Sequence, residues 1–172
     1  MFLKNIKNYF LIRVIKNNLQ NVKNSTSVNL IQTVGLLIDE SYFFEKDKLV
    51  QELIDNGILK SNIKFALYKD KIKKNEQIVE HTFSFNDINW RAEITDIALN
   101  VFISEKFDLL INYYDIEKAI LLKVTSNSNA HFKVGFSTVD KRLNHLMINT
   151  NAENYEVFAH ELFRYLKILK KI

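Results

Sequence analysis

The sequence predicts an α/β fold: a single three-layer Rossmann-like domain with a mainly parallel sheet, preceded by a basic N-terminal helix. Short apolar runs alternate along the chain with segments of about ten to fifteen residues at helical spacing, which is the pattern of parallel strands joined by crossover helices. The length of 172 residues suits one core of ordinary size and is too small for two. We therefore expect a basic helix over residues 1–24 and an α/β domain over residues 30–172.

The predicted strands are short and nearly continuous in apolar residues, as expected for strands buried on both faces. The strongest signals cover residues 34–38, 63–68, 107–113 and 132–136, and weaker ones cover 77–85 and 143–149.

The predicted helices show apolar residues at intervals of three and four. They cover residues 2–24, 45–56, 91–103, 115–124 and 153–170. Gly57 stands where a helix end favours a left-handed residue, and Asp115 stands where a negative charge caps a helix start. Glu156 and Lys167 place the expected charges at the two ends of the last helix.

Charge is unevenly distributed along the chain. The whole protein carries a net charge of +4, whereas residues 1–24 hold five cations and no acid, which leaves the remaining 148 residues at −1. These five cations are Lys4, Lys7, Arg13, Lys16 and Lys23. Such an asymmetry points to a polyanionic or acidic partner.

The first predicted helix has two apolar stripes on nearly opposite sides. One contains Phe2, Ile6, Tyr9 and Phe10, and the other contains Leu11, Ile15, Leu19 and Val22. Either the helix breaks near Phe10, or one half packs on the domain while the other half packs on something else. One interpretation is a core helix with a basic exposed side, and the other is an arm that docks on RNA or on an acidic protein surface.

Several chemistries lack the residues they need. The chain has no cysteine, no proline and three glycines, which excludes disulfides, thiolate metal sites and glycine-rich phosphate loops. Asp39 and Glu40 occupy the first strand-to-helix junction, where they would repel a dinucleotide. The four histidines share no metal-ligand spacing. We expect no cofactor, no metal and no catalytic residue.

A second hypothesis places a ligand crevice at the carboxyl ends of the strands, where open parallel sheets bind their ligands. Its candidate residues are Asn112, Tyr113, Asp115, Gly135 and Ser137. The adjacent Tyr113 and Tyr114 would stack on a ring or cover the sheet.

The segments FDLLINYYD, ILLKV and AHFKVGFS, over residues 107–137, resemble the later part of the N-terminal Rossmann-like half of heptosyltransferase-type glycosyltransferases. The whole chain also resembles an uncharacterised Bacteroidota domain family that shares FDLLINYYD and KVGFSTVDKRLNHLMI. The resemblance implies a parallel sheet with a crevice at the strand ends and Gly135 as a tight-turn residue. It implies no sugar transfer, because the second half that binds the nucleotide sugar is missing.

Together these observations favour a non-enzymatic RNA-binding module, most plausibly a peripheral ribosome-associated protein anchored by its basic helix. The expected RNA contacts are Lys4, Lys7, Arg13, Lys16, Lys23, Arg164, Lys167 and Lys171. Phosphate contacts of this kind carry no DNA sequence specificity. The alternatives are a small nucleotide-sugar-binding or glycosyltransferase-like protein and a protein-interaction scaffold. No export signal or membrane span is recognisable, so we expect a cytoplasmic protein.

Overall fold

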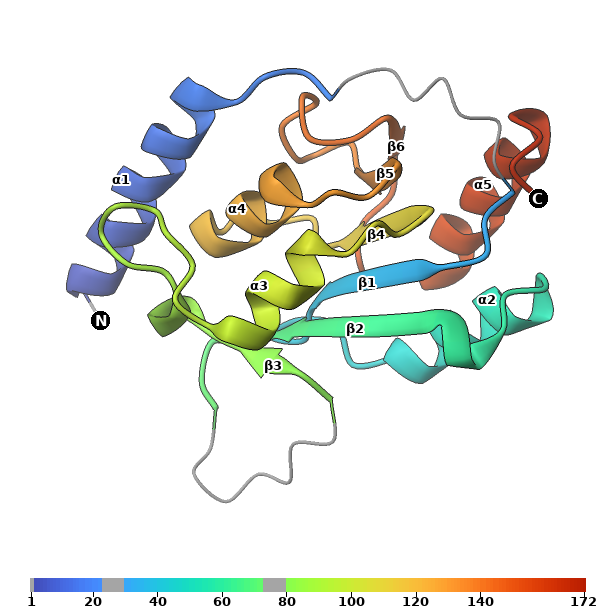
Figure 1. Cartoon of the computed structure of the whole chain (residues 1–172), viewed down its shortest axis with the longest axis horizontal. Coiled ribbons are helices and arrows are strands. Elements are labelled where there is room, and N and C mark those ends of the chain that lie inside the picture. Colours follow the sequence, from blue (N-terminus) through green and yellow to red (C-terminus); the bar gives the residue numbers. More distant parts are fainter. Residues whose placement is uncertain (1, 23–29, 73–79) are drawn as a thin grey trace.

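The computed structural model of the protein describes residues 2–22, 30–72 and 80–172. Its centre is a sheet in which all six strands pair in parallel, in the order β3-β2-β1-β4-β5-β6 (Figure 1). The strands are β1 (Val34–Asp39), β2 (Ile63–Tyr68), β3 (Thr82–Phe83), β4 (Leu109–Tyr113), β5 (Phe132–Phe136) and β6 (Leu146–Ile148).

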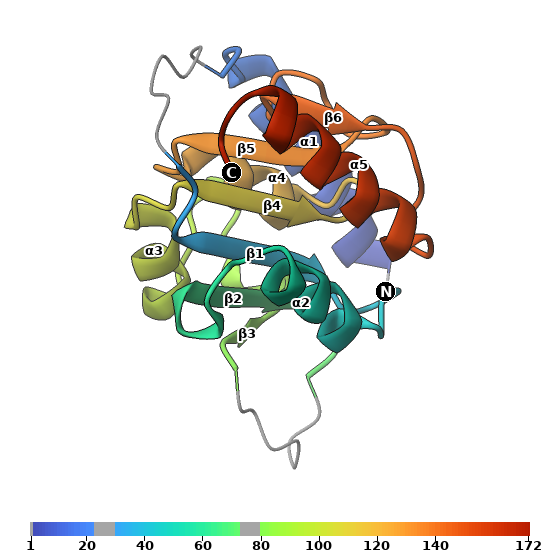
Figure 2. The same ribbon diagram turned by 90° about the vertical axis from the view of Figure 1, so that its right-hand side faces the viewer.

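Helices cover both faces of the sheet, so the fold has three layers (Figure 2). One face carries α1 (Phe2–Asn18), α3 (Ile97–Ser104) and α4 (Ala119–Asn127), and the other carries α2 (Lys46–Asp55) and α5 (Tyr155–Ile168). Two short 3-10 turns, η1 (Lys60–Asn62) and η2 (Phe85–Asp87), complete the described elements. The predicted α/β fold with a parallel sheet is therefore confirmed.

The positions of the strands follow from burial on both faces. Every residue of β1, β4 and β5 is buried, and their apolar side chains enter one core on each side of the sheet. Gly57, with φ of 96°, ends α2 in the left-handed conformation predicted for it. β3 is confined to two residues at the sheet edge, within the longer strand predicted there, whose residues 77–79 lie outside the described part.

The predicted start of α3 is wrong because local side-chain contacts hold the preceding residues in a turn. α3 begins at Ile97, not at Arg91, since Asp96 accepts a hydrogen bond from the backbone N–H of Leu99 at 2.6 Å. Before it, the Asn89 side chain accepts hydrogen bonds from the backbone N–H groups of Arg91 and Glu93, forming a turn.

The start of α4 shows a contact between distant parts of the chain. The helix begins at Ala119, and the side-chain oxygen of Asn8 in α1 accepts the hydrogen bond from its first backbone N–H at 2.9 Å. Asp115, predicted as the cap, lies four residues earlier, and its carboxylate accepts a hydrogen bond from the Ala152 N–H at 2.9 Å. α1 therefore supplies a cap that α4 lacks in its own sequence.

α1 is one continuous helix that ends at Asn18, so the prediction that it extends to residue 24 is wrong, and it does not break near Phe10. Leu11 and Ile15 are buried against the core next to α4, and Leu19 packs against the same core beyond the helix end. Ile6, Tyr9 and Phe10 of the other stripe are exposed, and so is Leu3. The two stripes thus separate as expected: one packs on the domain and the other is uncovered within the described residues.

Leu11 tests whether α1 is part of the fold. Its side chain is fully buried, so Leu11→Ala should lower the free energy of unfolding by about 2–5 kcal/mol, measured by urea denaturation. Tyr9→Ala is the matched control, because that side chain is 72% exposed and its loss should change stability by less than about 0.5 kcal/mol. Equal, small effects of the two substitutions would mean that α1 does not contribute to the core.

Candidate functional site

The strand order reverses between β1 and β4, and such a switch point is where open α/β sheets usually bind ligands. Here it is occupied by the side chain of Lys118, which precedes α4 and is 8% exposed. Its Nζ lies 2.6 Å from Oδ2 of Asp39, at the end of β1, and 3.4 Å from Oδ2 of Asp70, beyond β2. It also donates to the Ser41 hydroxyl at 3.3 Å.

Two aromatic rings and a lysine of α1 add to the contacts of Lys118 and Asp70 at the switch point. The Lys118 Nζ lies 4.4 Å from the ring centre of Tyr68 and 4.8 Å from that of Tyr42. Lys4 of α1 approaches the same Asp70 carboxylate at 3.7 Å. Burial alone would raise the pKa of Asp70, but the hydrogen bond from Tyr68 and the charge of Lys118 outweigh it and lower the pKa. The protein's own charges thus satisfy one another where a ligand would otherwise enter.

The candidate crevice residues near the strand ends have partners inside the fold. Asn112 is buried and donates to the Asn144 side chain at 2.7 Å. The Tyr113 ring packs against Phe43 and Phe136, its hydroxyl donates to the Ala152 carbonyl at 2.8 Å, and burial raises its pKa. These side chains therefore support the fold at this edge.

Gly135 and Ser137 have different surroundings. Gly135 lies inside β5 opposite Asn112, so the expectation of a tight-turn residue is wrong. A Cβ there would come within 2.6 Å of the Asn144 amide nitrogen, which explains why this position needs glycine. Ser137 is exposed just after β5 and donates to Asn149 at 3.1 Å.

The cations predicted to contact RNA from α1 are mostly engaged within the domain. Lys4 pairs with Asp70, and Lys16 pairs with Glu117 at 2.6 Å. Lys7 donates to the Ile88 carbonyl at 2.5 Å, lies over the rings of Phe85 and Trp90, and has a pKa lowered by burial. Arg13 is exposed, and Lys23 lies outside the described residues.

The other predicted cations lie in α5 or just after it, and α5 is on the other side of the sheet from α1. Arg164 pairs with Glu161 at 2.5 Å, and Lys167 is exposed. Lys171 is buried, with its Nζ 4.8 Å from the ring centre of Phe132. The two predicted groups of cations therefore do not join into one surface.

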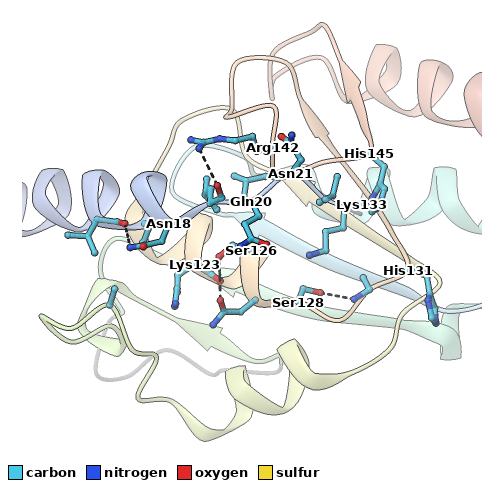
Figure 3. A pocket seen from close by; sticks show the side chains of 18 of the residues that line it. Asn18, Gln20, Asn21, Lys123, Ser126, Ser128, His131, Lys133, Arg142 and His145 are labelled. Carbon is cyan, nitrogen blue, oxygen red and sulfur yellow. Dashed lines mark hydrogen bonds between the residues drawn. The ribbon is translucent and has the colours of Figure 1, made fainter. Parts of the chain in front are cut away.

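A pocket of about 750 Å³ opens on the α1–α4 side, near the carboxyl end of α4 and the beginning of β5 (Figure 3). We call it the α4–β5 pocket. It is bounded by the last turn of α1 and residues 19–22, the loop before α3, the end of α4, and the connection between β5 and β6. Its volume lies within the range of about 300–1,000 Å³ that is typical of small-molecule sites.

The lining of the α4–β5 pocket is cationic. Four basic side chains border it, and no carboxylate does among the residues that the structure places around it. The four are Arg91, Lys123, Lys133 and Arg142. Asp140, behind the lining, holds Arg142 at 2.7 Å and has a pKa lowered to about 2, chiefly by the hydrogen bond from that guanidinium. Arg142 also donates to the Leu19 carbonyl at 3.3 Å, which fixes the segment after α1 to the pocket rim.

Lys133 is the most deeply buried of these cations, with 6% of its surface exposed. It extends from β5 to the end of α4, where Nζ donates to the Thr125 carbonyl at 2.8 Å. A cation is favourable at the carboxyl end of a helix, but burial lowers the pKa of this amine to about 8. The backbone N–H of Lys133 donates to Nδ1 of His145 at 2.9 Å, which orients a second pocket side chain.

A buried polar network lies behind Lys133. The Thr125 hydroxyl donates to the Asn112 side-chain oxygen at 2.9 Å, and the Tyr114 hydroxyl lies 2.7 Å from the same Thr125 oxygen. Asn112 continues the network to Asn144. The network fixes the end of α4 against β4, and therefore fixes the carbonyl that positions the Lys133 amine.

Sequence reasoning missed Lys123, Lys133, Arg91 and Arg142, because they belong to four segments that only the fold brings together. Lys133 alone carries a sequence signal. It is a lysine inside the apolar run 132–136, and a charge there requires a partner or a cavity.

The titration of Lys133 can be followed through stability. Its pKa is about 8 in the folded protein and near 10.5 in the unfolded chain, so the unfolded state binds more protons between these values. The free energy of unfolding should therefore rise with pH from about 8 to 10.5, relative to Lys133→Met, by up to about 3 kcal/mol. Urea denaturation of both proteins at pH 7, 8, 9 and 10 measures the difference. A difference independent of pH would show that this amine titrates normally.

Neither metal ligands nor a membrane span were found in the described ranges. There, no three or more acidic or histidine side chains gather in a way that could hold a metal ion. No helix in those ranges combines the length and the apolar character needed to cross a bilayer.

Comparisons with known proteins identify a family without an assigned activity. No curated protein and no solved structure matches the chain. A family model does match, over residues 7–169, which begin within α1 and include every strand. By this match the chain belongs to the family of unknown function DUF6913.

Proposed function

We propose that the protein binds a small phosphate-bearing ligand in the α4–β5 pocket. The observation that carries this proposal is a nucleotide-sized cavity bordered by four basic side chains and by no carboxylate among its described lining. Guanidinium and ammonium groups are the donors that proteins use for phosphate oxygens.

The polar residues of the pocket add neutral hydrogen-bonding groups to this charge. Asn18, Gln20 and Asn21 lie along one side, and Ser126 and Ser128 lie at the end of α4 (Figure 3). Amide and hydroxyl groups of this kind recognise sugar hydroxyls or base edges beside a phosphate. A nucleotide or a sugar phosphate therefore fits the composition of the pocket better than inorganic phosphate alone.

An RNA backbone presents the same phosphate chemistry in a polymer. Lys4, Lys7 and Lys16 have partners within the domain, and α1 and α5 lie on opposite faces of the sheet, so the cations predicted to contact RNA do not form one continuous surface. This distribution favours a compact ligand, and RNA binding is retained as an outcome of the same experiment.

Thermal unfolding with and without ligands tests the proposal. The ligands are inorganic phosphate, a nucleoside monophosphate and diphosphate, a nucleotide sugar, a sugar phosphate and a single-stranded RNA oligonucleotide. A ligand at 100 times its dissociation constant should add about 2.7 kcal/mol to the stability of the folded protein. Lys123→Ala and Arg91→Ala should each weaken binding about tenfold, because each removes one charged donor.

Lys167→Ala is the control, since it removes an exposed cation from α5 on the other face of the sheet. It should leave binding unchanged. Stabilisation by none of the ligands would contradict the proposal, and so would an equal loss of binding in the control. Binding of the oligonucleotide without any mononucleotide would favour the RNA module instead.

A second candidate function is docking to another protein through α1. The specific observation is the exposed apolar side of this helix, where Leu3 is 73% and Tyr9 is 72% exposed. Leu3, Ile6 and Phe10 are spaced as in helices that insert into a groove, and the helix contains no acid, which suits an acidic groove.

Photocrosslinking in cells tests this docking. A photoreactive residue at Tyr9 should give a discrete protein adduct that Ile6→Asp abolishes, because a buried carboxylate is unfavourable in an apolar groove. Val157 on α5, 49% exposed, is the control position and should give no such adduct. Equal adducts at both positions, or none at Tyr9, would exclude a specific partner for α1.

A further inference from the structure

Lys133 differs from the other cations of the α4–β5 pocket in its surroundings. It stands on a buried strand, whereas Lys123 and Arg91 stand on a helix and a loop next to solvent. Within the described residues, its Nζ donates only to the Thr125 carbonyl, although an ammonium group has three N–H donors. The Lys133 side chain lines the pocket (Figure 3). Its hydrogen bond to Thr125 holds the amine in place and leaves two N–H donors for a ligand.

We propose that the pocket takes a phosphorylated aldehyde or ketone and that the Lys133 amine forms a reversible imine with its carbonyl group. This inference rests on the proposed function, since the phosphate is the group that the other cations would hold. It adds the class of ligand and a covalent step at one atom.

The step is chemically balanced without any further reagent. The lone pair of the neutral Nζ attacks the carbonyl carbon, and proton transfer gives a carbinolamine. The carbonyl oxygen then leaves as water together with both amine hydrogens, and a C=N bond remains. Hydrolysis by water reverses the reaction, so no oxidant or reductant is needed.

The burial of Lys133 supports this role because only the neutral amine is nucleophilic. With a pKa of about 8, about half of the Lys133 amine is neutral at pH 8. A lysine with an ordinary pKa would be about 0.3% neutral at that pH. The exposed Arg91 guanidinium is available for the phosphate, whereas Arg142 is held by Asp140 and the Leu19 carbonyl.

Pyridoxal 5′-phosphate is a suitable probe, because it carries an aldehyde and a phosphate on one small ring. The full-length protein is incubated with it at pH 8, reduced with sodium borohydride, digested and analysed by mass spectrometry. We expect labelling of Lys133 at least tenfold above that of Lys123 or Lys167. Pyridoxal, which lacks the phosphate, should label Lys133 at least tenfold less.

Lys133→Arg keeps a positive charge and removes the nucleophile, so it should abolish the imine absorbance. Lys167→Arg, which changes an exposed lysine of α5 on the other face of the sheet, is the matched control and should still be labelled at Lys133. The labelling yield at Lys133 should rise with pH, and the midpoint of this rise should lie near pH 8. Labelling spread evenly over exposed lysines, or a yield unaffected by the missing phosphate, would overturn the inference.

The two proposals fail in different ways. If nucleotides or phosphate stabilise the protein but Lys133 is not labelled, the pocket binds phosphate and the imine is refuted. If neither stabilisation nor labelling occurs, the proposed function itself is refuted.

Discussion

The buried ion pair between Lys118 and Asp39 determines where this fold can hold a ligand. It lies at the switch point between β1 and β4, with the Asp70 carboxylate and the Tyr68 ring beside it. Removing one member of such a pair leaves a buried charge without compensation, at a cost of about 3–5 kcal/mol. In this protein, the usual ligand crevice of a doubly wound sheet is therefore filled by side chains that stabilise the fold.

α1 contributes to the contacts that close this crevice. The α4–β5 pocket opens at the other end of the strands, near the beginning of β5. Lys4 reaches Asp70, Asn8 caps α4, and Leu11 and Ile15 fill the core between α1 and the sheet. The same helix then ends over the beginning of β5, where its last turn forms one wall of the α4–β5 pocket. α1 therefore lies against the strand ends where open parallel sheets usually bind ligands. It also borders the α4–β5 pocket, which is not at that usual position.

The sequence was sufficient for the sheet, because strands buried on both faces read as apolar runs, and 63–68 and 132–136 were predicted to the residue. It was insufficient where one segment determines the structure of another. No local signal links Asn8 to Ala119, so the start of α4 was misplaced. Asp96, in contrast, is a local signal for the start of α3, because Asp is a common N-cap residue. The pocket escaped prediction because its cations lie more than 50 residues apart at the extremes, from Arg91 to Arg142.

Three influences act on the protonation of Lys133, and they act in opposite directions. The carboxyl end of α4 favours its charged form, whereas burial favours its neutral form and lowers its pKa. A bound phosphate would add negative charge and favour the ammonium again. A ligand that needs the neutral amine must therefore place its phosphate against Arg91 or Lys123 and its carbonyl against Lys133. This separation of charge and nucleophile is the property that would distinguish a phosphorylated carbonyl compound from a simple anion in the same pocket.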